Sequence, residues 1–150
     1  MPHSYVSALS HCVFSTKGRR DLVTPDLRRR LFPYMGGIAR ENSMRLLAAG
    51  GTLNHVHLLL SLPARIPIAK AVQLIKGGSS KWVHDAFPDR LDFEWQEGYG
   101  AFSVGVSQVS ATVRYINHQE AHHRATTFED EFVSFLKKHG IQYDARYVWG

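Results

Sequence analysis

The sequence predicts an α/β fold of the ferredoxin-like (RRM-like) type, a split β-α-β antiparallel sheet with helices on one face and a C-terminal helix that bears a tyrosine. Two observations predict it. Strand-like and helix-like stretches follow one another as strand, helix, strand, strand, helix, strand and then helices. The chain has 150 residues, a length typical of one domain, so we expect a single domain over 1–150. In this topology the first and third strands are the central pair of the sheet.

Each element is predicted from its periodicity and from the residues at its ends. We expect a strand over 4–16, a helix over 24–43, strands over 44–52 and 53–62, a helix over 66–87, short extended segments over 93–96 and 101–105, and helices over 107–125 and 127–140. Thr24 and Pro25 are typical of a helix start. Pro33 and the Gly36–Gly37 pair predict a kink or fraying within that helix.

The composition indicates an anionic partner, with nucleic acid the first candidate. Lys and Arg number 18 and Asp and Glu number 13, which gives a formal net charge of +5 and a pI of about 9.6. A single cysteine, Cys12, excludes an internal disulfide and fits a reducing compartment, so we expect a cytoplasmic protein. The first residues lack the pattern of a secretory signal, and no apolar run in the sequence is long enough to span a membrane.

Two histidines stand one residue apart at the start of the expected third strand, in the stretch NHVHLLLSL. Alternate residues of a strand face the same side, so His55 and His57 point together, while Val56, Leu58 and Leu60 face the core. Two imidazoles on one rigid strand can chelate a metal ion. The alternative is a pair of exposed histidines on a sheet face. Neither C-x-x-C nor H-E-x-x-H occurs, so a structural zinc site or a metalloprotease is unsupported.

A second polar group lies in the stretch VRYINHQEAHHR. On a continuous helix, one face would present Tyr115, His118, Gln119 and His122. Gln119 offers an oxygen to a metal ion, Tyr115 offers a phenol that can act as a nucleophile, and His123 is expected to point elsewhere. A site of two histidines and a glutamine would carry no carboxylate, and it would suit an ion that also binds the oxygens of a phosphodiester. The alternative is that these four residues form only an exposed polar stripe on the helix, without a role in catalysis.

With NHVHLLLSLP followed by VRYINHQEAHHR, the chain resembles the HUH single-tyrosine transposases. These are the transposases of the smallest insertion sequences and their relatives associated with repetitive extragenic palindromes. HUH stands for His, a hydrophobic residue and His, here His55-Val56-His57. The stretches HCVFSTKGRR, LIKGGSSKW and WQEGYGAFSVGVSQV extend the resemblance over nearly the whole chain.

The resemblance implies a fold, a reaction and a set of roles. The expected reaction cleaves and rejoins single-stranded DNA at hairpin-flanked ends through a covalent 5′-phosphotyrosine intermediate. Tyr115 would be the nucleophile, and His55, His57 and Gln119 would hold Mg²⁺ or Mn²⁺. The family forms homodimers in which the tyrosine helix of one subunit completes the histidine site of the other, so action in cis or in trans stays open. From the helical spacing, we also expect His122 to be the proton acceptor for the phenol.

Further residues are expected to contact DNA or to support the histidines. The basic and aromatic candidates are Lys17, Arg19, Arg20, Lys76 and Lys81 for phosphate contacts, and Trp95 and Tyr99 for stacking on unpaired bases. The alternatives are a solvated basic surface and ordinary core packing. His11, on the first strand, is either a support or ligand for the metal site or a hydrogen-bonded core histidine.

Three other functions stay open from the sequence. A domesticated relative would process chromosomal palindromic repeats with the same chemistry. A non-catalytic nucleic-acid-binding module could use the same fold. A metal-dependent hydrolase would use water and leave no protein-DNA adduct.

Overall fold

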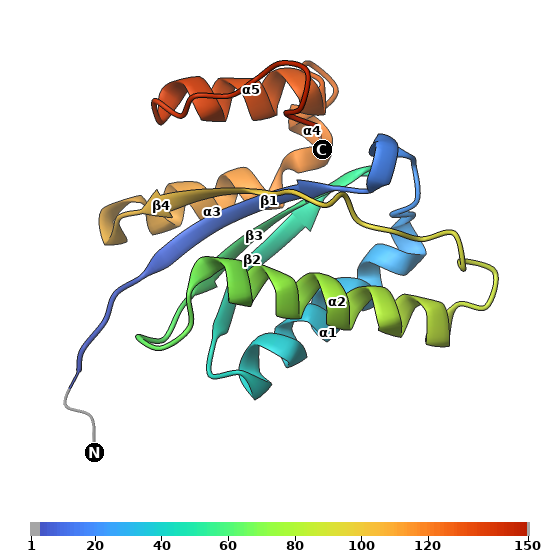
Figure 1. The fold of residues 1–150 in the computed structure, drawn as a ribbon, viewed down its shortest axis with the longest axis horizontal. Coiled ribbons are helices and arrows are strands. Elements are labelled where there is room, and N and C mark those ends of the chain that lie inside the picture. The colour runs from blue at the N-terminus through green and yellow to red at the C-terminus, as the bar shows by residue number, and fades with distance from the viewer. Residues whose placement is uncertain (1–3, 150) are drawn as a thin grey trace.

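The computed structural model describes residues 4–149, which form a four-stranded antiparallel sheet with helices on both of its faces (Figure 1). The strands are β1 (Leu9–Ser15), β2 (Arg45–Gly51), β3 (His55–Ser61) and β4 (Gly100–Val104). The α-helices are α1 (Pro25–Glu41), α2 (Ile68–Ala86), α3 (Val109–Asn117), α4 (Gln119–His122) and α5 (Phe128–Lys138). Two short 3-10 helices are η1 (Lys17–Arg19) and η2 (Val106–Gln108).

The strand order is β2-β3-β1-β4, with every neighbouring pair antiparallel. This is the ferredoxin-like order, so the predicted fold class is confirmed, and β1 and β3 are the central pair. The register places Val13 opposite His57 and Ser15 opposite His55. Because β3 is hydrogen-bonded along both edges, the two histidines stand on a rigid part of the molecule.

The helices divide between the two faces of the sheet (Figure 1). On one face α1 and α2 close the main apolar core, which takes Cys12 and Phe14 from β1. On the other face α3 packs against β2 and β3, and α5 lies on this same side of the sheet. A smaller apolar cluster joins α5 to this second face through Val13, Phe102, Phe128, Phe132 and Leu136. The histidine face of β3 is therefore covered by the C-terminal helices.

One glycine permits the close approach of α3 to the sheet. A Cβ added at Gly50, in β2, would lie 2.0 Å from the carbonyl oxygen of Ile116 in α3. No real side chain could occupy that space without moving α3. Since α3 carries Tyr115, this contact helps to set the distance between the tyrosine and the strand histidines.

The fraying predicted within the first long helix is not observed. The helix α1 runs without interruption from Pro25 to Glu41, with Pro33 inside it. Pro33 lies on the exposed side, where water can reach the carbonyl group that loses its hydrogen bond. Leu31 and Met35 on the opposite side are fully buried, so packing holds the helix together.

The predicted helix over 107–125 is divided. The helix α3 ends at Asn117 and α4 begins at Gln119, with His118 at φ −113 and ψ 28 between them. The break changes the direction in which the following side chains point. The extended segment predicted at 93–96 makes only an isolated bridge between Thr16 and Trp95. Within residues 4–149, no helix has both the length and the apolar character needed to cross a membrane.

Candidate active site

His55 and His57 are enclosed between the sheet and the C-terminal helices. The alternation along β3 turns both away from α1 and α2, and the exposed fraction of each is 0%. An exposed histidine pair is therefore excluded. The opposite face of the strand contributes Val56, Leu58 and Leu60 to the main core, as predicted.

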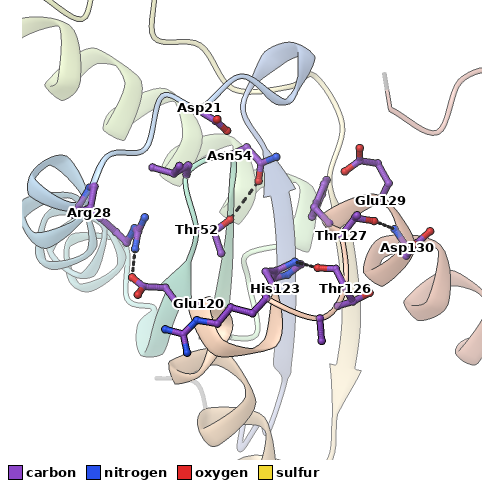
Figure 2. Close-up of a pocket in the computed structure, with 15 residues that line it drawn as sticks. Asp21, Arg28, Thr52, Asn54, Glu120, His123, Thr126, Thr127, Glu129 and Asp130 are labelled. Carbon is purple, nitrogen blue, oxygen red and sulfur yellow. Dashed lines mark hydrogen bonds and ion pairs between the residues drawn. The ribbon is translucent and has the colours of Figure 1, made fainter.

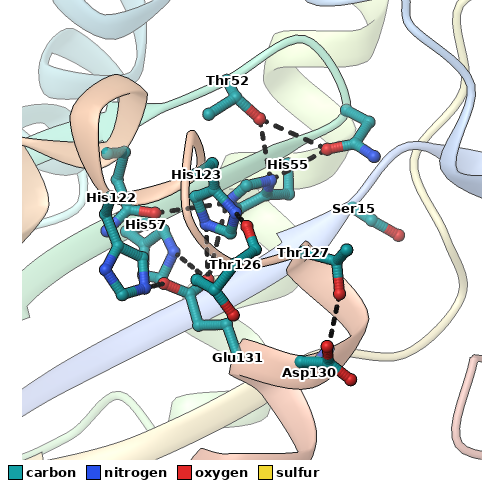
Figure 3. Close-up of polar contacts among 12 residues, drawn as sticks. Ser15, Thr52, His55, His57, His122, His123, Thr126, Thr127, Asp130 and Glu131 are labelled. Carbon is teal, nitrogen blue, oxygen red and sulfur yellow. Dashed lines mark hydrogen bonds and ion pairs between the residues drawn. The ribbon is translucent and has the colours of Figure 1, made fainter.

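Each of these histidines is held through its Nδ1 atom. Nδ1 of His55 lies 2.9 Å from Oδ1 of Asn54 and 3.0 Å from Oγ1 of Thr52 (Figure 3). Nδ1 of His57 lies 2.8 Å from Nε2 of His11, which β1 places beside it. Hydrogen bonds of this kind fix the orientation of a ring and leave the other nitrogen for a ligand. Thus Nε2 of both rings is directed toward the C-terminal helices.

Gln119 meets the strand histidines from α4. Its Oε1 lies 3.3 Å from Nε2 of His55, its exposed fraction is 1%, and its Nε2 donates to the carbonyl oxygen of Tyr115 at 3.2 Å. In the tautomer in which Nδ1 of His55 donates to the oxygen of Asn54, its Nε2 presents a lone pair toward another acceptor oxygen. Two lone pairs facing each other suit a cation, so the predicted ligands His55, His57 and Gln119 fit a divalent ion.

A carboxylate and a third histidine complete the cluster, and the sequence interpretation missed both. Glu131, from α5, has an exposed fraction of 4%, and its Oε1 lies 2.9 Å from Nε2 of His57 and 3.1 Å from Nε2 of His123. One donor atom each from His55, His57, His123 and Glu131 lies within 4.8 Å of all the others. The expectations that the site lacks a carboxylate and that His123 points elsewhere are both wrong.

Burial and charge act on these groups in opposite directions. Burial lowers the pKa of His55 from 6.5 to about 3, with a further contribution from neighbouring His57. Burial alone would raise the pKa of Glu131, but the short contacts of its carboxylate with His123 and His57 outweigh burial and hold that pKa well below its usual range. The site therefore combines a neutral His55 with an ionised carboxylate, which is a suitable donor set for a metal ion.

The tyrosine predicted as nucleophile lies at the edge of this cluster. The Tyr115 hydroxyl donates a hydrogen bond to Oε2 of Glu131 and lies 3.3 Å from Nε2 of His122. The ring centroids of Tyr115 and His57 are 5.7 Å apart within the same chain. Burial and the neighbouring carboxylate both raise the pKa of Tyr115, so the phenol keeps its proton in this arrangement. The structure thus brings Tyr115, Gln119 and His122 together with the strand histidines.

His118 does not join them. Its side chain is exposed, and its Nδ1 lies 2.6 Å from the carbonyl oxygen of Arg114, within the same turn. The break between α3 and α4 occurs at this residue, so the predicted four-residue stripe keeps only three members.

Two residues expected to contact DNA are engaged inside the protein. Trp95 has an exposed fraction of 6% and donates to Oγ of Ser79 at 3.1 Å, so stacking of its ring on a base is excluded in this arrangement. The Lys76 ammonium donates to the backbone carbonyl oxygens of residues 96, 97 and 98, which leaves it no free donor for a phosphate. Tyr99, by contrast, is 36% exposed.

The other basic residues of that prediction lie in ion pairs at the surface. Lys17 pairs with Glu94 at 3.6 Å, Arg20 with Asp92 at 2.9 Å, Arg19 with Glu129 at 3.6 Å and Lys81 with Asp85 at 3.1 Å. Exposed pairs of this kind are weak and can be exchanged for a phosphate. Contact of these residues with DNA stays a prediction.

Two cavities reach the cluster from outside. A cavity of about 800 Å³ extends along His123 and the loop that holds His55, with Arg28 and Arg124 in its wall (Figure 2). Nη1 of Arg28 lies 2.6 Å from Oε1 of Glu120, another residue of that wall. A smaller cavity of about 280 Å³ is lined by residues that include Tyr115, His122 and Glu131. A ligand can therefore reach His123 through the first cavity, and Glu131 and the Tyr115 phenol through the second.

Residues 4–119 match the model of the family described as "Transposase IS200 like". The chain belongs to the IS200-like transposase family. The predicted resemblance to HUH single-tyrosine transposases is thereby confirmed, and with it the expectation that the chain is a transposase. His55, His57, Tyr115 and Gln119 all lie within the matched residues.

Named relatives agree with this family. The chain is 27% identical over 125 residues to the transposase for insertion sequence element IS200 of Salmonella typhimurium, which covers 79% of this chain and 81% of that protein. It is 24% identical over 114 residues to the ISDra2 transposase TnpA of Deinococcus radiodurans, covering 73% and 81% respectively.

Two solved structures share the fold. A candidate transposase from Deinococcus radiodurans R1 superposes with a TM-score of 0.65 at 24% identity, covering 77% of this chain and 94% of that one. A REP-associated tyrosine transposase bound to a REP hairpin superposes with a TM-score of 0.61 at 16% identity, covering 82% and 73%.

Proposed function

We propose that this transposase cleaves and rejoins single-stranded DNA at hairpin-flanked ends, with Tyr115 as the nucleophile and a 5′-phosphotyrosine as the covalent intermediate. The observation that carries the proposal is the position of the Tyr115 hydroxyl. In a chain of the IS200-like family, it contacts Glu131 and lies 3.3 Å from Nε2 of His122, beside the buried strand histidines.

The metal in this proposal is Mg²⁺ or Mn²⁺ at His55, His57 and Gln119. Nε2 of His55 and Oε1 of Gln119 lie 3.3 Å apart, and both are acceptors in the tautomer of His55 that donates from Nδ1 to Asn54, which supports a cation at that place. When bound, a divalent ion supplies neutralisation of the charge that develops on the scissile phosphate.

The side chains of the chain carry the proton and the covalent bond. A phenol is a poor nucleophile while it keeps its proton, so in this proposal the hydroxyl turns from Oε2 of Glu131 to Nε2 of His122, which accepts the proton. The Tyr115 oxygen then bonds to phosphorus while the bond from phosphorus to the 3′ oxygen breaks. That oxygen takes the proton from His122 and leaves as a free 3′-OH. Attack of a 3′-OH on the phosphotyrosine reverses these steps and rejoins a strand.

The DNA substrate and the assembly belong to the same proposal. A transposase of the same fold has been solved bound to a REP hairpin, which supports a hairpin in the substrate of this chain. From the family resemblance, we further propose a homodimer. Because Tyr115 lies beside His57 of its own chain, the geometry supports cleavage in cis.

A denaturing-gel assay tests the proposal. Labelled single-stranded DNA from the hairpin flanks of the gene is incubated with the protein and with Mg²⁺ or Mn²⁺. The wild type should give a metal-dependent, denaturant-resistant protein-DNA band, and Tyr115→Phe should give none. Tyr34→Phe is the control, since Tyr34 lies on α1 and is 40% exposed.

Two results would count against the proposal. Cleavage that survives Tyr115→Phe would assign the chemistry to water, as in a metal-dependent hydrolase. Hairpin binding by the wild type, without cleavage in either metal, would assign the chain to the non-catalytic binding modules.

A further inference from the structure

The cluster around the strand histidines holds two donors beyond those expected from the family pattern. They are His123, just after α4, and Glu131, in α5. Both lie beyond residue 119, where the match to the family model ends. Their role therefore has to be derived from the contacts that they make in this chain.

The protonation of His123 follows from its neighbours. Nδ1 of His123 lies 2.9 Å from the carbonyl oxygen of Thr126, which can only accept, so Nδ1 carries a hydrogen. In the neutral ring, Nε2 then presents its lone pair to Oε1 of Glu131, 3.1 Å away. Two acceptors at this distance repel each other unless they share a cation.

The same situation recurs at a second ring. In the tautomer that donates from Nδ1 to Asn54, Nε2 of His55 likewise presents a lone pair toward Oε1 of Gln119 at 3.3 Å and lies 3.6 Å from Oε1 of Glu131. One metal ion at the common centre can be shared by His55, His57, His123 and Glu131, because one donor atom of each lies within 4.8 Å of the others.

The types of donor decide which ions fit best. Three imidazole nitrogens and one carboxylate oxygen suit zinc, nickel, cobalt or manganese. Magnesium prefers oxygen ligands and keeps several of its waters, and a buried set of three nitrogens offers it little. On the side chains of His55 and His57 the exposed fraction is 0%, on Glu131 it is 2% and on His123 it is 10%, so little room is left for a shell of water.

We propose that His123 and Glu131 join His55 and His57 in a four-residue metal site that takes a transition-metal ion in preference to Mg²⁺. This inference rests on the proposed function and specifies the metal of that same site. It assigns α5 a role in the site, because Glu131 binds the ion through Oε1 while its Oε2 accepts the hydrogen bond from Tyr115. Glu131 thereby links the metal site to the nucleophile.

Binding measurements without DNA test this proposal. Protein freed of metal by a chelator is titrated separately with Zn²⁺, Ni²⁺, Mn²⁺ and Mg²⁺ in a calorimeter, and its thermal midpoint is followed with each ion. We expect one ion per chain and an affinity for Ni²⁺ and Zn²⁺ at least about 100-fold above that for Mg²⁺. Glu131→Gln and His123→Gln should each weaken Ni²⁺ binding by about 10- to 100-fold or more.

Matched controls separate ligand loss from general damage. Asp130→Asn lies on the same helix as Glu131, and His139→Gln lies just after that helix; both side chains are exposed and should leave binding unchanged. Visible absorption of the Co²⁺-loaded protein gives a second reading, because loss of one ligand changes the band even where the affinity falls only slightly.

The outcomes distinguish this proposal from the one on which it rests. Wild-type affinity for Ni²⁺ in both Glu131→Gln and His123→Gln, or equal affinity of the wild type for Mg²⁺ and Ni²⁺, would overturn the four-residue site. If His55→Ala also kept wild-type binding, the metal site of the proposed transposition chemistry would fail as well. A Tyr115-dependent DNA adduct formed in Mg²⁺ alone by Glu131→Gln would leave that chemistry standing and contradict the role of Glu131.

Discussion

The orientation of His57 depends on one hydrogen bond from the first strand. Nε2 of His11 lies 2.8 Å from Nδ1 of His57, so His11 determines which nitrogen of His57 faces Glu131. A partner of this kind typically contributes a factor of about 10 to 100 to metal affinity. His11 is thus hydrogen-bonded to a strand histidine, and we expect it to support the proposed metal site.

His11→Ala should weaken Ni²⁺ binding by about 10- to 100-fold in a calorimetric titration, because His57 loses the bond that holds its ring. His11→Gln, whose amide oxygen can still accept from Nδ1 of His57, should keep a larger share of the affinity. Equal binding by the wild type and His11→Ala would show that packing alone orients His57.

At the scale of elements, the position of Tyr115 depends on how closely α3 approaches β2. A Cβ at Gly50 would lie 2.0 Å from the carbonyl oxygen of Ile116, whereas one at Gly77 in α2 would meet nothing within 4 Å. Gly50→Ala should therefore push α3 away from the sheet. We expect the free energy of unfolding to fall by about 1–3 kcal/mol and the DNA adduct to be lost.

Gly77→Ala is the matched control for that change. An alanine in the middle of a helix is favoured over glycine by roughly 0.5–1 kcal/mol, so this variant should be slightly more stable and fully active. Urea unfolding and the adduct assay report both properties. An active Gly50→Ala of wild-type stability would show that the close approach of α3 is not needed.

The order of elements and the pairing of β1 with β3 could be predicted because strand and helix periodicities are local properties of the sequence. Alternation along β3 likewise placed His55 and His57 together. The helix break at His118 could not be predicted, since no proline or glycine marks it. Spacing alone therefore put His118 on the wrong face.

Glu131 shows the limit of such predictions most clearly. It stands eight residues after His123 in a separate helix, and no spacing motif connects it to the strand histidines. Its position depends on the packing of α5 through Phe128 and Phe132 onto the second face of the sheet. Long-range packing of this kind carries no periodic signal in the sequence, although a glutamate on the apolar side of a predicted helix could have drawn attention.

For the whole molecule, the buried histidines predict how stability depends on pH. Burial lowers the pKa of His11 and of His55 from 6.5 to about 3 in each case. In the unfolded chain both groups bind a proton as the pH falls through about 6.5, while the folded chain stays neutral there. Since the unfolded state then binds more protons, the free energy of unfolding should decrease as the pH falls from 6.5 toward 3.

Urea unfolding of the metal-free protein at about pH 7.5 and about pH 5 measures this effect. The wild type should be less stable at the lower pH, and His11→Gln should show a smaller difference because it removes one of the two groups. His118→Gln, an exposed position that does not contact either histidine, should behave as the wild type does. A free energy of unfolding that rises on acidification would contradict the assignment of neutral buried histidines.

The central claim is that Tyr115 forms the covalent bond to DNA, and the site of that bond can be measured directly. Wild-type protein is incubated with its hairpin-flanked single-stranded DNA and a divalent metal, then digested, and the nucleotide-bearing peptide is sequenced by mass spectrometry. We predict the phosphodiester on Tyr115, in the peptide YINHQEAHHR or its neighbour extended toward the N-terminus. The claim would be contradicted if the DNA were cleaved and the nucleotide were found on another tyrosine, or on no peptide.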